Sequence, residues 1–278
     1  MENSILSSIG YPVSNLEELQ KFVPSAFSKT YHPDRTDRYS FVATDNLVNS
    51  LISLGWELHS GKQNGVSKFA RHVIRFTNPK LGYMKLKNDN VKPQIILDNS
   101  HNGGSSAQLH MGLFRLVCTN GLVIAMPGLY TNVKFRHMGV KFEELKKLME
   151  IVAEQYTVVG THISEMQKVL MNAVQKEEFA IKAVAQREPH MFIQKDGTIN
   201  TKKVHKITNI PEILSPIRGE DKADNLWSVF NVVQERMIKG GYNRISENGR
   251  QSKTRGITNA TRNIAFNKEL WEIAEEYI

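Results

Sequence analysis

The sequence predicts an α+β fold, with a mostly antiparallel sheet in the N-terminal half and packed helices in the C-terminal half. Apolar runs between residues 39 and 123 are typical of strands, and the connections between them are too short for repeated crossover helices. From Lys141 onward, apolar residues recur at helical spacing instead. We therefore divide the chain into a sheet core at 1–140 and a helical part at 141–278, packed together as one unit.

In the N-terminal half we expect two helices and a series of strands. A short helix over 16–22 follows Ser14-Asn15, and a second begins at Thr44 or Asp45, either of which can cap it, and ends at Gly55. The last two strands flank a polar, glycine-containing loop, so we place them at the centre of the sheet. The strands are predicted at 39–43, 56–59, 69–76, 94–97 and 108–123.

The C-terminal half reads as helices joined by loops. Apolar spacing predicts helices at 142–156 and 164–185, and the turn signals Asp196-Gly197, Pro211 and Pro216 predict an irregular region over 189–222. A strong helix then starts at Asp224 or a neighbour and ends at Gly240-Gly241, and Asn267 caps a last one. Between these two helices we expect a flexible basic loop that is pinned at both ends.

Composition excludes several classes of protein. The chain has ordinary hydrophobic and charged fractions, so we expect a substantial core. Cys118 is its only cysteine, which excludes disulfides within one chain and cysteine-clustered zinc sites, and its apolar surroundings predict a buried side chain. The sequence has no 18-residue apolar run and no basic-then-hydrophobic N-terminus, so we expect no membrane partner and a location in the host cytoplasm.

The basic charge is concentrated in one stretch. Residues 236–262 contain seven basic residues and one acidic residue, Glu247, and therefore carry +6 of the chain's net charge of +8. Cations interleaved with Ser, Thr, Asn and Gly match what a phosphate backbone needs, although such runs also occur on plain solvated surfaces. The predicted nucleic-acid contacts in and beside the basic loop 239–265 are Arg236, Lys239, Arg244, Arg250, Lys253, Arg255 and Arg262.

A second basic group accompanies the early strands. Grooves that bind single strands combine such cations with aromatic stacking platforms, for which Trp56, Tyr39 and Phe69 are candidates. The alternative is that the aromatic residues belong to the core, and for Trp56, just after a helix-ending glycine, we favour this alternative. With Lys62 nearby, the predicted contacts in this group are Lys68, Arg71 and Arg75.

The loop between the central strands is a third candidate. Glycines let backbone N–H groups approach a phosphate, and serines add hydroxyl donors. The loop could thus contact a nucleic-acid backbone or an adjacent subunit, or simply connect two core strands. Its candidate residues are His101, Asn102, Gly103, Gly104, Ser105 and Ser106.

Interpretations of this region as a catalytic or metal site are weaker. Asp98, His101 and His110 offer carboxylate and imidazole ligands, but no tight cluster of such residues accompanies them. Ser105 or Ser106 with a histidine suggests a nucleophile and a base, but the Gly-x-Ser-x-Gly pattern is absent. We therefore predict no catalytic residue, no metal and no cofactor.

Motifs that span nearly the whole chain resemble a known family. In this sequence they are Phe22–Ser28, Asp37–Tyr39, Asn99–Ser106, Gly112–Val123, Asn225–Trp227, Gln234–Gly241, Thr254–Thr258 and Asn267–Trp271. They resemble the YafZ/YfjQ/YubP group of prophage and conjugative-plasmid proteins, part of the family called domain of unknown function 932 or phage/plasmid-like protein. The family tends to have Asp-Gly-Ser-Ser where this chain has Asn-Gly-Gly-Ser-Ser at 102–106, so a loop carboxylate is missing.

The resemblance implies a mobile-element setting but no activity. At the level of fold alone, a helix ending in Gly55-Trp56 before basic strands is also similar to the core of Rad-fifty-two-type annealing proteins, which bind single-stranded DNA in rings. Our leading hypothesis is a non-catalytic DNA-binding protein of a phage, prophage or plasmid that prefers single strands, serves annealing or recombination, and forms a homo-oligomer. The alternatives are an anti-defence or host-takeover protein that binds a host defence protein, and an enzyme that acts on nucleic acid.

Overall fold

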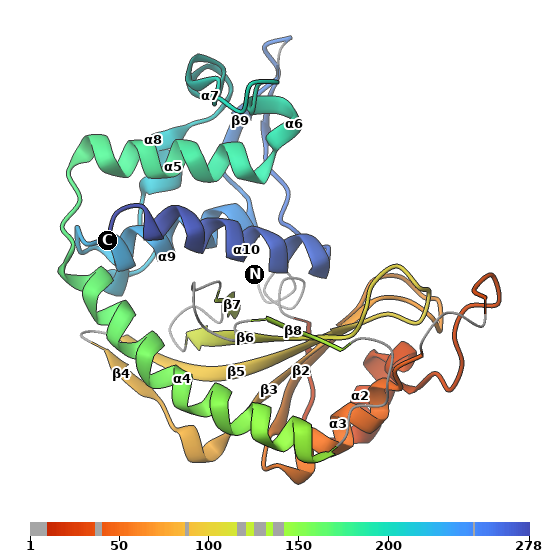
Figure 1. Cartoon of the computed structure of the whole chain (residues 1–278). Coiled ribbons are helices and arrows are strands. Elements are labelled where there is room, and N and C mark those ends of the chain that lie inside the picture. The colour runs from red at the N-terminus through yellow and green to blue at the C-terminus, as the bar shows by residue number, and fades with distance from the viewer. Residues whose placement is uncertain are drawn as a thin grey trace. The chain divides into compact units, whose positions relative to one another are not determined.

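The computed structural model describes residues 10–36, 41–86, 89–115, 121–124, 132–135, 142–246 and 248–278 (Figure 1). The chain forms two compact units. The first comprises Met1–Lys85 and Asn90–Val159, and the second comprises Leu86–Asp89 and Gly160–Ile278. Strands dominate the N-terminal half and helices the C-terminal half, so the predicted α+β class is confirmed.

Among the described residues, eight strands form one sheet, in the order β1-β2-β3-β5-β6-β7, with β4 paired to β5 and β8 paired to β6. The pairs β1–β2, β2–β3, β3–β5 and β5–β6 are antiparallel, as predicted. The strands are β1 (Tyr11–Pro12), β2 (Glu57–Gln63), β3 (His72–Thr77), β4 (Met84–Leu86), β5 (Asp89–Asn99), β6 (Gln108–Arg115), β7 (Gly121–Val123) and β8 (Asn132–Lys134).

Short helices pack on the sheet of the first unit. They are α2 (Leu16–Phe22), α3 (Thr44–Ser53) and the 3₁₀ turns η1 (Pro24–Phe27) and η2 (Pro79–Leu81). The position of Gly61 in β2 shows how closely α2 packs: an added Cβ there would lie 2.7 Å from Val23 and 2.9 Å from Leu19. The long helix α4 (Phe142–Lys168) contacts the centre of the sheet, where the Tyr156 hydroxyl donates to the backbone oxygens of Gln94 and Gly112.

Several predictions for this half are confirmed and others are corrected. The helix at 16–22 has the expected bounds, and the Asn15 side chain accepts from the Glu18 N–H at 2.9 Å. The helix after Thr44 also forms, but its N-cap is Ala43, because the Thr44 hydroxyl is used in a buried network instead. Residues 41–43 are not a strand, and the rest of the strand predicted at 39–43, like Cys118, lies outside the described residues.

The second unit is built from helices and one small hairpin (Figure 1). Trp227 and Phe230 stack with ring centroids 5.9 Å apart, Phe230 packs edge-on against Trp271, and the Trp227 indole donates to Asp89 at 3.0 Å. After α4, the elements are α5 (Ala173–Arg187), α6 (Pro189–Phe192), α7 (Thr201–Ile207), α8 (Ile210–Leu214), η3 (Gly219–Asp221), α9 (Leu226–Lys239), β9 (Asn243–Ile245), β10 (Gln251–Lys253) and α10 (Ala260–Glu275).

Four predictions for the C-terminal half were wrong. Helix α4 runs without a break through Ser164, because Val159 and Ile163 are fully buried and hold its middle. The region 189–222 is not irregular, since it contains three short helices and a 3₁₀ turn. The basic stretch is not a flexible loop, since it forms a hairpin. The last helix, α10, begins at Ala260, so Asn267 is not its cap but a buried residue inside it that accepts from Gln234 at 2.9 Å.

Across the described residues, we find no helix that has both the length and the apolar composition needed to cross a membrane.

Candidate nucleic-acid interface

The basic stretch of the second unit folds into the hairpin β9–β10. Its strands pair in antiparallel register, with Ser252 opposite Arg244. The turn closes through hydrogen bonds from the Ser246 N–H to the Arg250 carbonyl at 2.9 Å and from the Gly249 N–H to the Ser246 carbonyl at 2.8 Å. Gly249 has a φ of +81°, which L side chains rarely adopt. The basic residues are therefore presented by a defined turn with an exposed outer strand.

Helix α7 lies beside this hairpin. Its sequence Thr-Lys-Lys-Val-His-Lys-Ile is capped by Asn200, whose side chain accepts from the Lys203 N–H. A β-bridge joins Thr208, just after the helix, to Arg244 in β9, and the Glu212 carboxylate accepts from the Asn243 N–H at 2.7 Å. These contacts bring the lysines of α7 to the same surface as the hairpin.

Four of the predicted cations near the hairpin have internal partners. Lys239 pairs with Glu235 at 2.6 Å, and Arg236 donates to the Ser215 carbonyl at 3.2 Å. Two more ion pairs, each at 2.8 Å, are Arg244–Glu188 and Arg262–Glu269. Of these four, Arg244 lies in the hairpin, where its ion pair ties β9 to Glu188 after α5, whereas Arg236 and Lys239 lie on α9 and Arg262 lies on α10. A nucleic acid would have to compete with the partners of all four.

The other three cations are exposed. The side chains of Arg250, Lys253 and Arg255 form no ion pair or hydrogen bond with any residue that the structure describes. The same holds for Lys202 and Lys206 on α7, which the sequence interpretation missed because it treated 189–222 as irregular. An asparagine cap followed by apolar residues at i and i+3 was the signal that could have revealed this helix.

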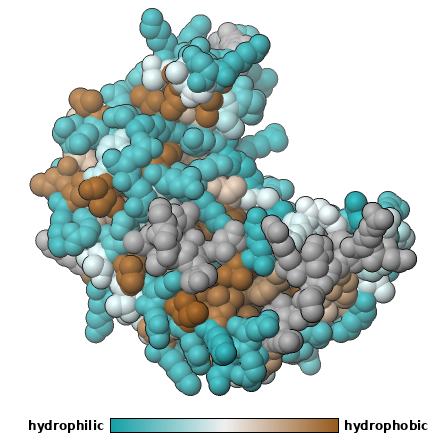
Figure 2. Space-filling model, viewed as in Figure 1, coloured by the Kyte–Doolittle hydropathy of each residue, from teal (hydrophilic) through white to brown (hydrophobic). Residues whose placement is uncertain are grey.

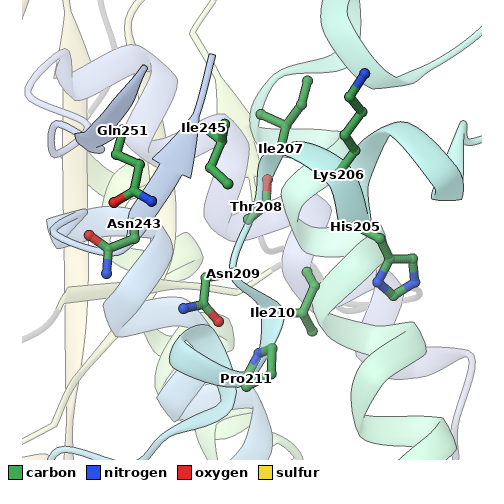
Figure 3. A pocket seen from close by; sticks show the side chains of 10 residues that line it. All are labelled: His205, Lys206, Ile207, Thr208, Asn209, Ile210, Pro211, Asn243, Ile245 and Gln251. Carbon is green, nitrogen blue, oxygen red and sulfur yellow. The ribbon is translucent and has the colours of Figure 1, made fainter. Parts of the chain in front are cut away.

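Hollows follow the junction of α7 and the hairpin within the described part of the second unit. The first, of about 390 Å³, places Asn243 and Gln251 of the hairpin opposite Ile210 and His205 (Figure 3). A second, of about 640 Å³, has a wall of three lysines from α7. A third, of about 520 Å³, lies by Arg244 and Met191. The surface over α7 and the hairpin is mainly hydrophilic with a few hydrophobic residues among the polar ones (Figure 2).

The residues of the second predicted basic group differ in their exposure to solvent. Lys68 is exposed, and its ammonium lies 4.9 Å from the Phe69 ring centroid. Arg71 forms a two-pronged contact with Asp98 through Nε and Nη2. Arg75 is only 2% exposed, so this side chain is not at the surface. Trp56 is 2% exposed, which confirms that it belongs to the core, and Phe69 is buried as well, while Tyr39 lies outside the described residues.

The loop from His101 to Ser106 uses much of its polar capacity internally. The Asn102 side chain accepts from the Gly104 N–H at 2.9 Å, and the backbone carbonyl of Asn102 accepts from Arg35 Nε at 2.8 Å. Ser105 and Ser100 share a hydrogen bond at 3.0 Å. Gly103 has a φ of +74° and faces Arg35 so closely that an added Cβ would lie 2.6 Å from that side chain. Asn102, Gly104 and Ser106 remain exposed.

The His101 ring belongs to a buried polar network. The Thr44 hydroxyl lies 2.8 Å from His72 Nε2, 3.2 Å from His101 Nε2 and 2.9 Å from the Asn99 amide. Burial lowers the pKa of His72 to about 3 and that of His101 to about 4, so both rings are neutral near neutral pH. Ser25 lies 3.0 Å from His72 Nδ1, but both residues are fully buried, so this pair cannot meet a substrate in this structure.

The pair Asp98 and His110 does not form a metal centre with its described neighbours. Burial alone would raise the pKa of Asp98, but the neighbouring His110 and the hydrogen bonds from Arg71 hold it below the ordinary value. The structure gathers no group of three or more His, Cys, Asp or Glu side chains suited to a metal within its described ranges.

Comparison with known proteins gives matches over most of the chain. Residues 31–271 match the family described as Domain of unknown function (DUF932). The UPF0380 proteins YafZ and YfjQ of Escherichia coli (strain K12) are each 29% identical over 266 residues, covering 93% of this chain and 89% of each relative. No solved structure matches.

Proposed function

The chain belongs to the family described as Domain of unknown function (DUF932), and we propose a function for it from the surface features of the second unit, because the family description gives no activity. The protein binds single-stranded DNA, without catalysis, through the hairpin β9–β10 and helix α7. Its setting is a phage, prophage or plasmid, where such binding serves annealing or recombination. The setting and the role rest on the sequence resemblance, whereas the interface rests on the geometry described above.

The observation that carries the proposal is the set of unpaired cations on two adjacent elements. Lys202 and Lys206 come from α7, and Arg250, Lys253 and Arg255 come from the hairpin and the strand that leaves it. A cation held by an internal carboxylate gains little from a phosphate, whereas an exposed unpaired cation releases counterions from the nucleic acid when it binds. The five side chains therefore supply affinity without loss of internal contacts.

The hollows support a preference for single strands. Their walls combine the apolar side chains Ile207 and Ile245 with the amides of Asn243 and Gln251, and Ile245 is 40% exposed. Apolar and amide groups contact the faces and edges of unstacked bases, which a duplex keeps stacked and paired. Phosphates on the cations and bases toward the hollows would use both features at once.

A charge-matched pair of variants tests the interface. The first combines Lys206→Ala, Arg250→Ala and Lys253→Ala. The control combines Lys80→Ala, Lys146→Ala and Lys147→Ala, which removes the same charge from exposed positions outside the interface. Binding to a labelled single-stranded oligonucleotide is measured by fluorescence anisotropy over a salt series. We expect the slope of log affinity against log salt to become shallower by about 2 in the first variant and to change little in the control.

Two results would overturn the proposal. The first is no binding to single-stranded DNA at low salt. The second is an equal loss in the two triple variants, which would indicate a general charge effect rather than this surface. Duplex DNA of the same length, measured in parallel, tests the strand preference, and the mass of the complex gives the number of protein chains bound.

A further inference from the structure

One face of the sheet carries several buried polar side chains near its centre. Side chains alternate between the faces along each strand. The opposite face carries the apolar residues Ile74, Phe76 and Leu97. On the polar face, Arg75 lies opposite Ser60 and Ile96, and Gln94 lies opposite Thr77 and Gly112. These polar residues are buried as deeply as the apolar ones, which is unusual for charged side chains.

Arg75 is the central feature of this polar face. It is 2% exposed, and neither Nε nor Nη1 has a hydrogen-bond partner among the residues that the structure describes. Asp98 lies on the same face but forms its two-pronged contact with Arg71 instead. A guanidinium buried without a counter-charge is costly, and its planar fork is suited to two oxygens of a carboxylate or phosphate.

Gln94 lies beside Arg75 on the adjacent strand. It is fully buried, and neither its amide nitrogen nor its amide oxygen has a partner within the described part of the chain. Native proteins rarely leave both ends of a buried amide unsatisfied. The two side chains thus present unused donors on the same face of neighbouring strands, which points to a missing acceptor rather than to a single misplaced group.

Two residues of β2 complete the cluster. Lys62 lies on the same face, and burial together with the nearby charge of Arg75 lowers its pKa. His59, at a bulge in β2, has its pKa lowered to about 4 by burial and by Arg75 and Lys92. Its buried Nδ1 has no hydrogen-bond partner in the described ranges. Its ring centroid lies 4.6 Å from that of Phe114 in β6, although β3 and β5 separate their strands. The contact between these two rings therefore crosses β3 and β5 on the face that carries Gln94.

We propose that this face of the sheet is a binding site for the phosphate group of a small molecule, held by Arg75, Gln94 and Lys62. Two cations match a phosphate dianion better than a single carboxylate. The depth of the site excludes a continuous nucleic-acid strand and favours a small ligand. This site is separate from the proposed DNA interface, and neither proposal depends on the other.

Calorimetric titration and thermal unfolding of the full chain test the site. The probes are sodium phosphate and AMP, which separate free phosphate from a nucleotide, with sodium acetate and sodium chloride at matched ionic strength. We expect phosphate or AMP to bind and to raise Tm. Sodium acetate and sodium chloride should neither bind nor raise Tm. Arg75→Met should abolish the binding, and Lys62→Ala should weaken it by about tenfold. Lys68→Ala, an exposed cation close in sequence, should bind as the wild type does.

The outcomes distinguish a site from a structural charge. If Arg75→Met does not fold, Gln94→Leu and Lys62→Ala still decide the matter, because each removes a polar group without removing the guanidinium. A Tm that rises equally in all variants, or binding that survives Lys62→Ala and Gln94→Leu unchanged, would overturn the proposal. So would the absence of any effect of phosphate and AMP on the wild type, or binding of acetate as tight as that of phosphate.

Discussion

Polar and charged groups occupy two opposite environments in this protein. On the hairpin and α7 of the second unit, cations such as Arg250 and Lys206 are exposed, and their side chains pair with none of the described residues. In the first unit, Arg75, His72 and His101 are almost completely buried. An exposed charge costs the fold little and responds strongly to salt, whereas a buried polar group depends on each hydrogen bond that it makes. The first setting suits a large polyanion, and the second suits fixed, short-range contacts.

Acid should affect the buried histidines most. His59, His72 and His101 have folded-state pKa values of about 4, 3 and 4, below the ordinary value of 6.5. As the pH falls below 6.5, the unfolded chain binds protons that the folded chain does not, so stability is lost down to about pH 4. Between pH 6 and pH 5 we expect a loss of about 1 kcal/mol per histidine. Urea unfolding across pH measures this, and His101→Gln should make the dependence shallower; an unchanged dependence would contradict it.

The next largest difference should be in how the two binding affinities depend on salt concentration. If the five unpaired cations each neutralise one phosphate, the slope of log affinity against log salt is about −3.5 for single strands. Affinity for DNA then falls by about 100-fold between 50 and 200 mM salt. Phosphate binding at Arg75 should change far less, because buried pairs are only weakly screened. Fluorescence anisotropy measures DNA binding and calorimetry measures phosphate binding at the two salt concentrations. Equal salt dependence of the two affinities would contradict this prediction.

Removing one buried hydroxyl should have a smaller but clear effect on stability. Thr44→Val keeps the shape of the side chain but leaves the polar atoms of His72 and Asn99 without their shared partner. We expect a loss of about 2 kcal/mol in the free energy of unfolding. Ser53→Ala removes an exposed hydroxyl from the same helix and should cost less than about 0.5 kcal/mol. Equal costs, measured by urea unfolding, would show that the network contributes little.

The smallest effect should distinguish two arginines of the basic stretch. Arg262 pairs with Glu269 at 2.8 Å, and both side chains are about one-third exposed. Solvent screening limits the contribution of such a pair, so we expect Arg262→Ala to lower stability by about 1 kcal/mol or less. Arg250→Ala should leave stability unchanged within about 0.5 kcal/mol and instead weaken DNA binding. The reverse pattern would contradict our division of this stretch into structural and free cations.

Local signals in the sequence were sufficient where a helix begins and ends with its own capping residues. The helix at 16–22 and the start of α9 both follow an asparagine that accepts from a backbone N–H, and the sequence placed both. They were not sufficient where tertiary packing decides. Buried Val159 and Ile163 carry α4 past a glycine and a serine that resemble a break, and Asn267 resembles a cap but is buried within α10.

The candidate sites show the same limit. The sequence located the excess charge near the hairpin, but it could not tell which cations have carboxylate partners. Glu188, the partner of Arg244, lies far from it along the chain, and Glu269, the partner of Arg262, is seven residues further along α10. It also could not separate exposed Lys68 from buried Arg75, because alternation along a strand does not reveal whether the second face is covered. Lys206 was missed because short helices have weak sequence signals.

The neck of the hairpin has a consequence for how this protein can vary. The Gly241 N–H donates to the Thr254 carbonyl at 2.8 Å, and the Ile257 N–H donates to the Ile238 carbonyl at 2.8 Å, so the two ends of the segment are fastened together. Gly240 sits at this crossing, where an added Cβ would lie 2.6 Å from the Thr254 oxygen. The hairpin is therefore a closed appendage that can lengthen, shorten or be exchanged while α9 and α10 keep their packing.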